Sequence, residues 1–200
     1  MGYRNLLREI KVEPTSAIVK GKGPMLVLDT IPDKAASNSP VKVWCKPDTG
    51  WIKLSIDGSL STSDGRAGTG MILRRDDGSV IFMACRALLN CSDALEAELE
   101  ACLEGLKLSR QHSQLPLIIE TDSSLLVDAV KSLVDDRSNF HVLVNDIRRL
   151  VSLDSCCLVT KASRTQVRVS DALAKFARTQ DRTMTWLGSG PDCADRKSVV

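Results

Sequence analysis

The sequence predicts one mixed α/β domain in which helices pack on a sheet. Three observations predict this fold: an alternating apolar segment at 51–59, a strand-rich stretch up to about residue 86, and alternating helical and strand patterns from 92 to 179. An apolar share of 43% with 26% charged residues is typical of a globular protein. The net charge of +2 gives no chain-wide basic signal, so any nucleic-acid footprint has to be local.

Three strands open the predicted domain. Every second residue from 52 to 56 is apolar in WIKLSIDGS, which predicts a half-buried strand with Asp57 on its polar face. Gly58 either ends this strand or lets another backbone come close. Segments 67–75 and 79–86 flank the turn Asp-Asp-Gly at 76–78, and the three strands are predicted to form an antiparallel meander.

Helices and strands alternate in the second half. Helical patterns cover 92–111, 123–134, 139–153 and 169–179, with strands predicted at 115–121 and 155–161. The domain is expected to span 44–187. Residues 1–43 have no sustained period and hold four prolines, so they are interpreted as a linker or the remnant of an upstream module. Residues 188–200 are predicted to be a disordered tail.

The cysteine and histidine content argues against a zinc site. The seven cysteines are scattered and form no CxxC pair, and the chain has two histidines. Free and mostly buried thiols in a reducing compartment are the better interpretation. The sequence has no apolar run of membrane-spanning length, and its first residues are too charged for a secretory signal. We therefore expect an intracellular protein, with nucleus and cytoplasm both open.

Four carboxylates are candidate ligands or catalytic groups. Asp57 stands at the end of the first alternating strand, where Asp before Gly is also ordinary turn chemistry. On the helix at 92–111, Glu98 is the glutamate that points toward the apolar side, whereas Glu96, Glu100 and Glu104 share the predicted solvent face. Glu98 is therefore either a site residue or the partner of a neighbouring backbone or arginine.

Asp122 and Asp171 can likewise be explained without a functional site. Asp122 ends the apolar strand just before a helix, so it is either the N-cap of that helix or a group mounted at the carboxyl edge of the sheet. Glu120 lies on the same side of the strand, as a supporting partner or a surface carboxylate. Asp171 lies in the first turn of the last helix, where an acid favours the helix dipole. It would contribute to a site from the rim.

Acidic side chains together with a local basic patch suit phosphate chemistry. Two divalent cations held by carboxylates are a solution for phosphodiester cleavage, and Mg²⁺ prefers oxygen ligands and needs no His or Cys. Between 156 and 180 the chain holds five basic residues against one acid, Asp171: Lys161, Arg164, Arg168, Lys175 and Arg178. This patch is either a phosphate-binding surface or a solvated face.

Five segments in this order resemble type 1 ribonuclease H: IDGS (56–59), AGTGMILRRDDGSVI (67–81), ALEAELEACLEGL (94–106), ETDSSLLVDAV (120–130) and SDALAKFA (170–177). The chain looks most like the ribonuclease H-like domains of plant proteins and of non-LTR retrotransposon polyproteins, over about residues 44 to 187. The resemblance implies a ribonuclease H-like α/β fold. Its sheet is mixed and five-stranded, with three antiparallel strands followed by parallel ones, and is flanked by helices.

The resemblance also implies an activity and its residues. It implies an endonuclease that hydrolyses the RNA strand of RNA–DNA hybrids with two Mg²⁺ ions, or Mn²⁺ as a substitute. The family's catalytic, metal-binding acids fall on Asp57, Glu98, Asp122 and Asp171. The expected nucleic-acid contacts are Gly58, Ser59, Ser123, Lys161, Arg164 and Arg168. Gly58 would allow close approach of the sugar–phosphate chain. We expect a monomer whose partner is the hybrid, with no membrane association.

The chain departs from the family pattern around the last loop and the first helix. Residues 161–170 hold no histidine, and Val167 stands where the related domains have the asparagine of Arg-x-x-Asn. Ala94, Leu95 and Glu96 replace the polar residues that contact RNA in the family, and Ser55 replaces an asparagine. These changes keep a second hypothesis open: a retroelement-derived domain that binds nucleic acid or a protein without efficient cleavage.

Overall fold

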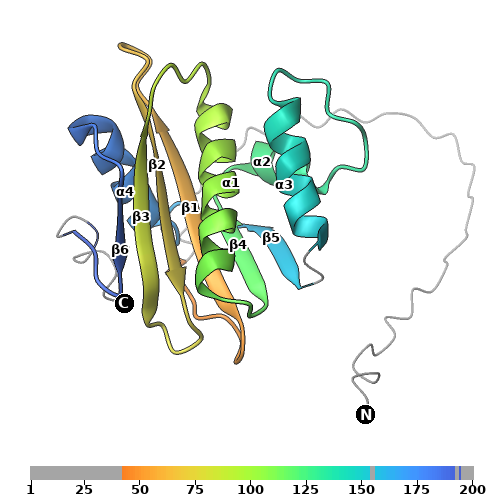
Figure 1. Ribbon diagram of the computed structural model, residues 1–200, viewed down its shortest axis with the longest axis vertical. Coiled ribbons are helices and arrows are strands. Elements are labelled where there is room, and N and C mark those ends of the chain that lie inside the picture. Colours follow the sequence, from red (N-terminus) through yellow and green to blue (C-terminus); the bar gives the residue numbers. More distant parts are fainter. Residues whose placement is uncertain (1–41, 154–155, 192–193, 195–200) are drawn as a thin grey trace, which may run out of the picture. The chain divides into compact units, whose positions relative to one another are not determined.

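The computed structural model describes residues 42–153, 156–191 and 194. The predicted linker at 1–43 lies outside these residues apart from its last two positions. Figure 1 shows the described domain as a sheet with helices packed on it. The domain has a mixed α/β fold, as predicted.

The first three strands form the predicted antiparallel meander at the centre of the sheet. They are β1 (Ile52–Leu60), β2 (Ala67–Arg74) and β3 (Val80–Leu88). Two further strands, β4 (Leu117–Thr121) and β5 (Cys157–Lys161), run parallel to β1 on its other side. The strand order is β5-β4-β1-β2-β3-β6.

The sixth strand corrects the expectation of five. The residues of β6 (Met184–Leu187) pair antiparallel with β3. This strand has only four residues and no clear alternation, which is why its pattern did not predict it. It covers the edge of β3 that would otherwise be unpaired.

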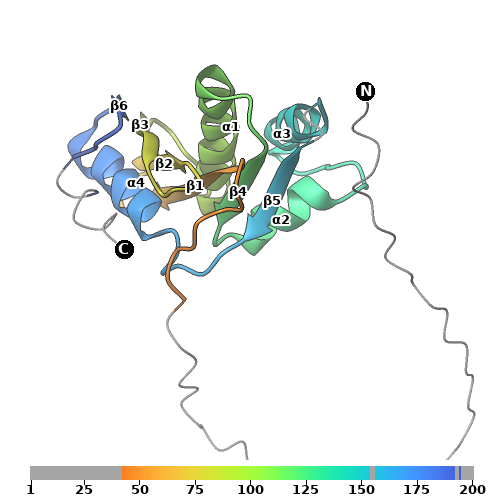
Figure 2. The same cartoon turned by 90° about the horizontal axis from the view of Figure 1, so that it is seen from below.

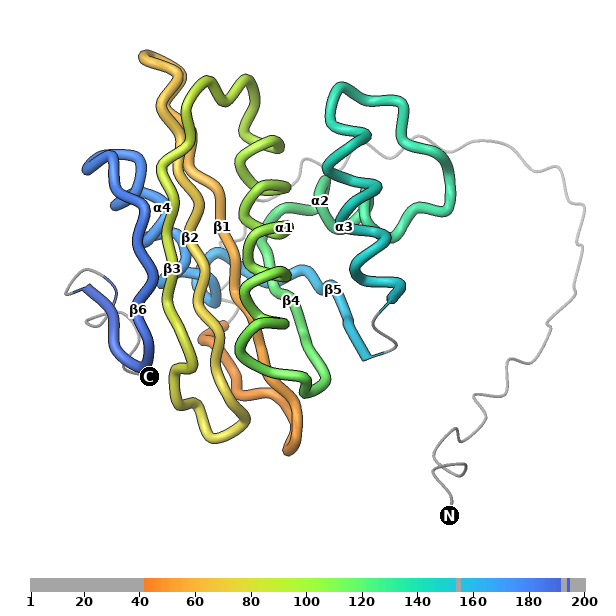
Figure 3. The backbone as a smooth tube through the Cα atoms, viewed as in Figure 1, coloured from red at the N-terminus to blue at the C-terminus, as the bar shows by residue number. Residues whose placement is uncertain are grey.

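Helices cover the two faces of the sheet. They are α1 (Ala94–His112), α2 (Ser124–Lys131), α3 (His141–Leu153) and α4 (Arg168–Gln180), within a few residues of the predicted ranges. Figure 2 shows α1 and α3 on one side of the sheet and α4 on the other. Figure 3 traces β1 between β4 and β2, with α1 packed on β1, in the region that carries the candidate site.

The β1 strand is buried on both faces, which corrects the expectation of a half-buried strand. Ile52, Leu54 and Ile56 are 0% exposed in the core beneath α1. On the opposite face Lys53 and Asp57 are buried as well. The reason is tertiary: α4 packs on the meander near Asp57, and Trp44 and the carbonyl of Cys45 lie against the ammonium of Lys53. Periodicity within β1 cannot report these contacts.

The chain continues in contact with the sheet after β6. Gly188 donates its amide to the carbonyl of Ile81, and Gly190 lies against Met83. Ala194 is fully buried in the cluster that contains Met83. These described residues of the predicted disordered tail are therefore packed on the domain, and the tail's other residues, 192–193 and 195–200, lie outside the described part.

The described cysteines form no disulfide with one another. Cys85, Cys91 and Cys102 are buried, whereas Cys45 and Cys156 are exposed. The prediction of mostly buried thiols therefore holds for half of the six described cysteines.

Candidate metal centre and cleft

Asp57 lies within β1 on the face that α4 covers. Its register partner on β2 is Gly70, and a side chain there would collide with the backbone of α4 at Ser170 and Ala174. A glycine at this position therefore lets α4 approach the sheet closely. This approach brings Asp171, which α4 carries, near Asp57.

Glu98 reaches the same region from α1. The helix begins with Asp93 as N-cap, whose side chain accepts a hydrogen bond of 2.7 Å from the amide of Leu95. One turn later the backbone of Ala97 and Glu98 lies directly over Gly58. The helical periodicity thus identified the glutamate that points into the protein. Glu100 and Glu104, on the predicted solvent face, are instead partly buried in ion pairs with Arg86 of 2.6 and 2.8 Å.

Asp122 follows β4 directly and does not cap α2. The N-cap is Ser123, whose Oγ accepts a hydrogen bond of 3.3 Å from the amide of Leu126. Because Ser123 satisfies the helix N-terminus, the carboxylate of Asp122 has no capping role. It accepts a hydrogen bond of 3.2 Å from Nε of Arg164. The alternative of Asp122 as a cap residue is therefore wrong.

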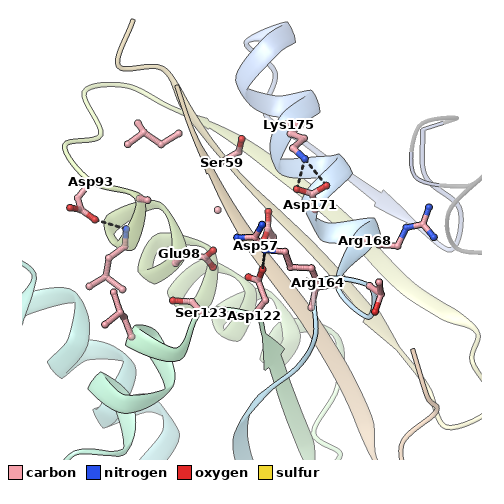
Figure 4. A pocket seen from close by; sticks show the side chains of 17 residues that line it. Asp57, Ser59, Asp93, Glu98, Asp122, Ser123, Arg164, Arg168, Asp171 and Lys175 are labelled. Carbon is pink, nitrogen blue, oxygen red and sulfur yellow. Dashed lines mark hydrogen bonds and ion pairs between the residues drawn. The ribbon is translucent and has the colours of Figure 1, made fainter. Parts of the chain in front are cut away.

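Asp57, Glu98 and Asp122 converge on one point. One carboxylate oxygen of each lies within 4.8 Å of the other two, and Figure 4 shows the three side chains facing each other from β1, α1 and the end of β4. Three hard oxygen donors at this spacing suit a divalent cation such as Mg²⁺. The sequence predicted all three residues, and the structure brings them together.

The electrostatics of this cluster also favour a cation. Burial raises the pKa of Asp57 to about 9, and repulsion from Glu98, Asp171 and Asp122 adds to it. Burial, and then repulsion from Asp122, raises the pKa of Glu98 to about 7, against hydrogen bonds from the Gly58 backbone and the Thr121 hydroxyl. A bound cation would offset this repulsion, so the residues present fit a metal centre.

Asp171 lies at the rim rather than in the close cluster. Its two carboxylate oxygens lie 2.7 and 2.8 Å from Nζ of Lys175, one helical turn along α4. It is still near enough to raise the pKa of Asp57. This is the rim position predicted for it.

The four acids line one cleft of about 740 Å³. Arg164, Arg168 and Lys175 contribute positive charge from the α4 side, and Leu95 and Leu125 form an apolar part of the wall from α1 and α2. Nine of the ten predicted site residues line it: Asp57, Gly58, Ser59, Glu98, Asp122, Ser123, Arg164, Arg168 and Asp171. The tenth, Lys161, is exposed at the end of β5 and outside this lining.

Three predicted nucleic-acid contacts have structural partners. A Cβ on Gly58 would lie 2.6 Å from the backbone of α1, so this glycine makes room for the helix. The Oγ of Ser59 accepts a hydrogen bond of 3.0 Å from Arg178. Ser123 caps α2. Sequence reasoning missed Thr121, the last residue of β4 and the neighbour of Asp122, because a Thr in a strand is ordinary.

Residues 55–177 match the family model described as "Reverse transcriptase-like". The chain belongs to this family. The match runs from within β1 through most of α4 and so includes all four acids.

Similar proteins are ribonuclease H proteins. The chain is 27% identical over 134 residues to an Arabidopsis thaliana protein named "Putative ribonuclease H protein", a match that covers 67% of this chain and 22% of that protein. RNase H1 from Halobacterium salinarum has a similar structure, with a TM-score of 0.61 and 20% identity over 66% of this chain and all of that one. An RNase H1 from compost in complex with an RNA/DNA hybrid has a TM-score of 0.58 and 18% identity, covering 65% and 98% of the two chains.

At these identities the structural matches show the fold alone. They agree with the ribonuclease H-like arrangement of sheet and helices found in this member of the family. Within the described part of the chain, the helices include none with the length and apolar character that a membrane span requires.

Proposed function

We propose that the chain is a Mg²⁺-dependent endonuclease that hydrolyses the RNA strand of RNA–DNA hybrids. The observation that carries this proposal is the convergence of Asp57, Glu98 and Asp122 from three separate elements, with ligand atoms within 4.8 Å of one another. The resemblance to ribonuclease H proteins supports the reaction class.

The acids have distinct places in the proposed site. With Asp57, Glu98 and Asp122 as ligands and Asp171 as an auxiliary ligand, two Mg²⁺ ions would activate the attacking water and stabilise the leaving 3′-oxygen. Mn²⁺ would substitute. The rigidity of the site comes from the chain, because β1, α1 and the end of β4 are held by the buried core beneath α1.

The basic side of the cleft would hold the substrate backbone. Arg164 and Arg168 are exposed, and the side chain of Lys175 is 57% exposed beside Asp171. Phosphate contacts of this kind position a duplex without reading its sequence. The 2′-hydroxyls and the A-like geometry would then distinguish the hybrid. The compost RNase H1, which was solved with an RNA/DNA hybrid, supports this substrate class. The proposed enzyme acts as a monomer.

A cleavage assay on a labelled RNA–DNA hybrid with Mg²⁺ tests the proposal. Asp122→Asn removes one ligand charge and should lower cleavage by at least about 100-fold, the scale on which loss of transition-state stabilisation acts. Asp128→Asn makes the same change at an exposed position of α2, outside the cleft lining, and should cleave like the wild type. Equal cleavage by the wild type and Asp122→Asn would overturn the proposed site.

One observation favours a second candidate function, a binding module that does not cleave. Val167 occupies the N-cap of α4, is 1% exposed, and supplies no capping hydrogen bond. The loop before Asp171 therefore presents no polar side chain at the position where the related domains carry asparagine. Hybrid binding by the wild type with no cleavage in Mg²⁺ or Mn²⁺ would establish this second function.

A further inference from the structure

Thr121 connects two of the carboxylates without being one of them. It is the last residue of β4 and is 0% exposed. Its Oγ1 accepts a hydrogen bond of 3.0 Å from the amide of Ser123, across the turn that carries Asp122. The same hydroxyl lies 3.5 Å from Oε2 of Glu98 on α1, to which it donates. One side chain thus contacts both the Asp122 turn and the Glu98 carboxylate.

The direction of these two hydrogen bonds follows from the chemistry of a hydroxyl. The amide of Ser123 can only donate, so Thr121 accepts there, and its single proton is left for another acceptor. A buried hydroxyl proton is costly to leave unpaired. The carboxylate of Glu98 is the acceptor within reach. An ionised carboxylate has no proton to donate, so it can only accept.

The backbone of Thr121 is fixed as well. Its carbonyl accepts a hydrogen bond of 2.8 Å from the amide of Ala162, just after β5. The hydroxyl therefore projects from a strand end that is tied to its neighbour. A glutamate side chain has several rotatable bonds, and ordering it costs side-chain entropy. A fixed donor reduces the number of rotamers that Glu98 samples.

We propose that Thr121 is a positioning residue for the metal centre, whose hydroxyl holds the Glu98 carboxylate and the Asp122 turn at the separation that a divalent cation needs. The inference rests on the proposed function, because it assigns a supporting role within the same site. Thr121 contacts no reacting atom; it acts through Glu98 and through the turn.

Mn²⁺ binding measured by calorimetry on the full chain, without nucleic acid, tests the proposal. Thr121→Val keeps the shape and a β-branched side chain but removes the hydroxyl. Loss of a group that orients metal ligands lowers metal affinity by about 10- to 100-fold, and we expect this range for Thr121→Val. Thr121→Ser restores the hydroxyl and should bind Mn²⁺ within about threefold of the wild type, on the same scale.

Thr69→Val is the matched control. Thr69 is also a strand residue with 0% exposure, but its Oγ1 has no hydrogen-bond partner among the residues that the structure describes. This variant removes an equally buried hydroxyl and should leave Mn²⁺ affinity unchanged. If Thr121→Val fails to give a cooperative thermal transition, Thr121→Ala takes its place, since alanine also has no hydrogen-bond donor in its side chain.

The outcomes separate this inference from the proposed function. Wild-type affinity in a folded Thr121→Val or Thr121→Ala variant overturns the positioning role alone. Equal loss in Thr121→Ser and Thr121→Val overturns it too, because the hydroxyl would not be the cause. A wild-type chain that binds no Mn²⁺ overturns the metal centre itself. Absence of cleavage by a chain that binds Mn²⁺ overturns the nuclease and leaves the role of Thr121 standing.

Discussion

A Cβ atom placed on Gly58 would lie 2.6 Å from the backbone nitrogen of Glu98, so β1 and α1 meet next to Asp57. The spacing between two of the three converging carboxylates therefore depends on the absence of a side chain at residue 58. The sequence left two interpretations of this glycine open. The strand continues to Leu60, and the close approach of another backbone is the one that the structure confirms.

Gly58→Ala should weaken both the fold and the metal centre. The added methyl has to push α1 away from β1, and overpacking of this kind costs about 1–3 kcal/mol. Because Glu98 moves with α1, Mn²⁺ affinity should fall as well. Urea unfolding and calorimetry on the same preparation measure the two effects.

Gly105→Ala provides the comparison for that variant. A Cβ at Gly105 would meet flexible side-chain ends of Leu54 and Ile56, at 3.0 and 3.3 Å, rather than backbone. It lies on the same helix, and alanine there also raises helix propensity. We expect a smaller loss of stability and unchanged Mn²⁺ affinity. A larger loss for Gly105→Ala than for Gly58→Ala would contradict the argument.

The stability of the metal-free protein should fall as the pH rises from 5 to 8. The pKa of Asp57 is raised to about 9 and that of Glu98 to about 7, mainly by burial. In the unfolded chain both groups ionise near pH 4. The folded state therefore holds more protons across this window, and stability decreases with pH by at most about 1.4 kcal/mol per pH unit for each group. Urea unfolding in EDTA measures the slope.

Two further measurements identify the groups responsible for that slope. Asp57→Asn removes the group with the larger shift and should flatten the profile above pH 7, where Glu98 has already ionised. Saturating Mn²⁺ should flatten it too, because a bound cation stabilises the ionised carboxylates. A metal-free stability that rises between pH 5 and 8 would show that these carboxylates are not buried together.

Local sequence patterns predicted the strands and helices, and they also identified one side chain of the candidate site. The 3.6-residue periodicity of α1 singled out Glu98 because the neighbouring apolar residues define the inward face of the helix. Hairpin chemistry at 76–78 likewise predicted the antiparallel pairing of β2 and β3. Asp171 came from the family resemblance, since an acid in the first turn of a helix is ordinary on its own.

Other features depend on contacts between segments that are far apart in the sequence, and a local sequence pattern does not predict such contacts. Asp and Ser are both good N-cap residues, so the sequence alone does not decide whether Asp122 or Ser123 caps α2. The geometry of the turn between β4 and α2 decides it. Asp57, on the polar face of β1, is buried because glycines of β2 let α4 approach, as at its register partner Gly70. Glu120, interpreted as a supporting or surface carboxylate, is 6% exposed and paired with Lys53 at 2.9 Å.

Glu120→Gln should separate fold stability from metal binding. The Lys53–Glu120 pair is buried, with Trp44 covering it at 5.8 Å from the ammonium. Removing one charge of a buried pair leaves the other uncompensated and costs about 3 kcal/mol or more. Urea unfolding should therefore show a large loss of stability, while Mn²⁺ affinity stays within about threefold of the wild type, below the effect of losing a group that orients ligands.

Asp122→Asn, two residues further along, should behave in the opposite way. Its carboxylate is partly exposed and belongs to the converging cluster, so Mn²⁺ affinity falls and stability changes little. If Glu120→Gln lost Mn²⁺ binding at unchanged stability, Glu120 would have to be counted with the metal centre.

Arg168→Gln should weaken hybrid binding and its dependence on salt. Arg168 lines the cleft and is exposed, and Figure 4 shows its side chain pointing away from the carboxylates, where a phosphate could reach it. Loss of one phosphate contact lowers the slope of log affinity against log salt by about 1. Affinity is measured in an Asp122→Asn background so that the hybrid stays intact.

Arg149→Gln removes the same charge from an exposed position of α3 outside the cleft and should leave the slope unchanged. Equal slopes for the two variants would mean that the hybrid does not lie along the α4 side of the cleft.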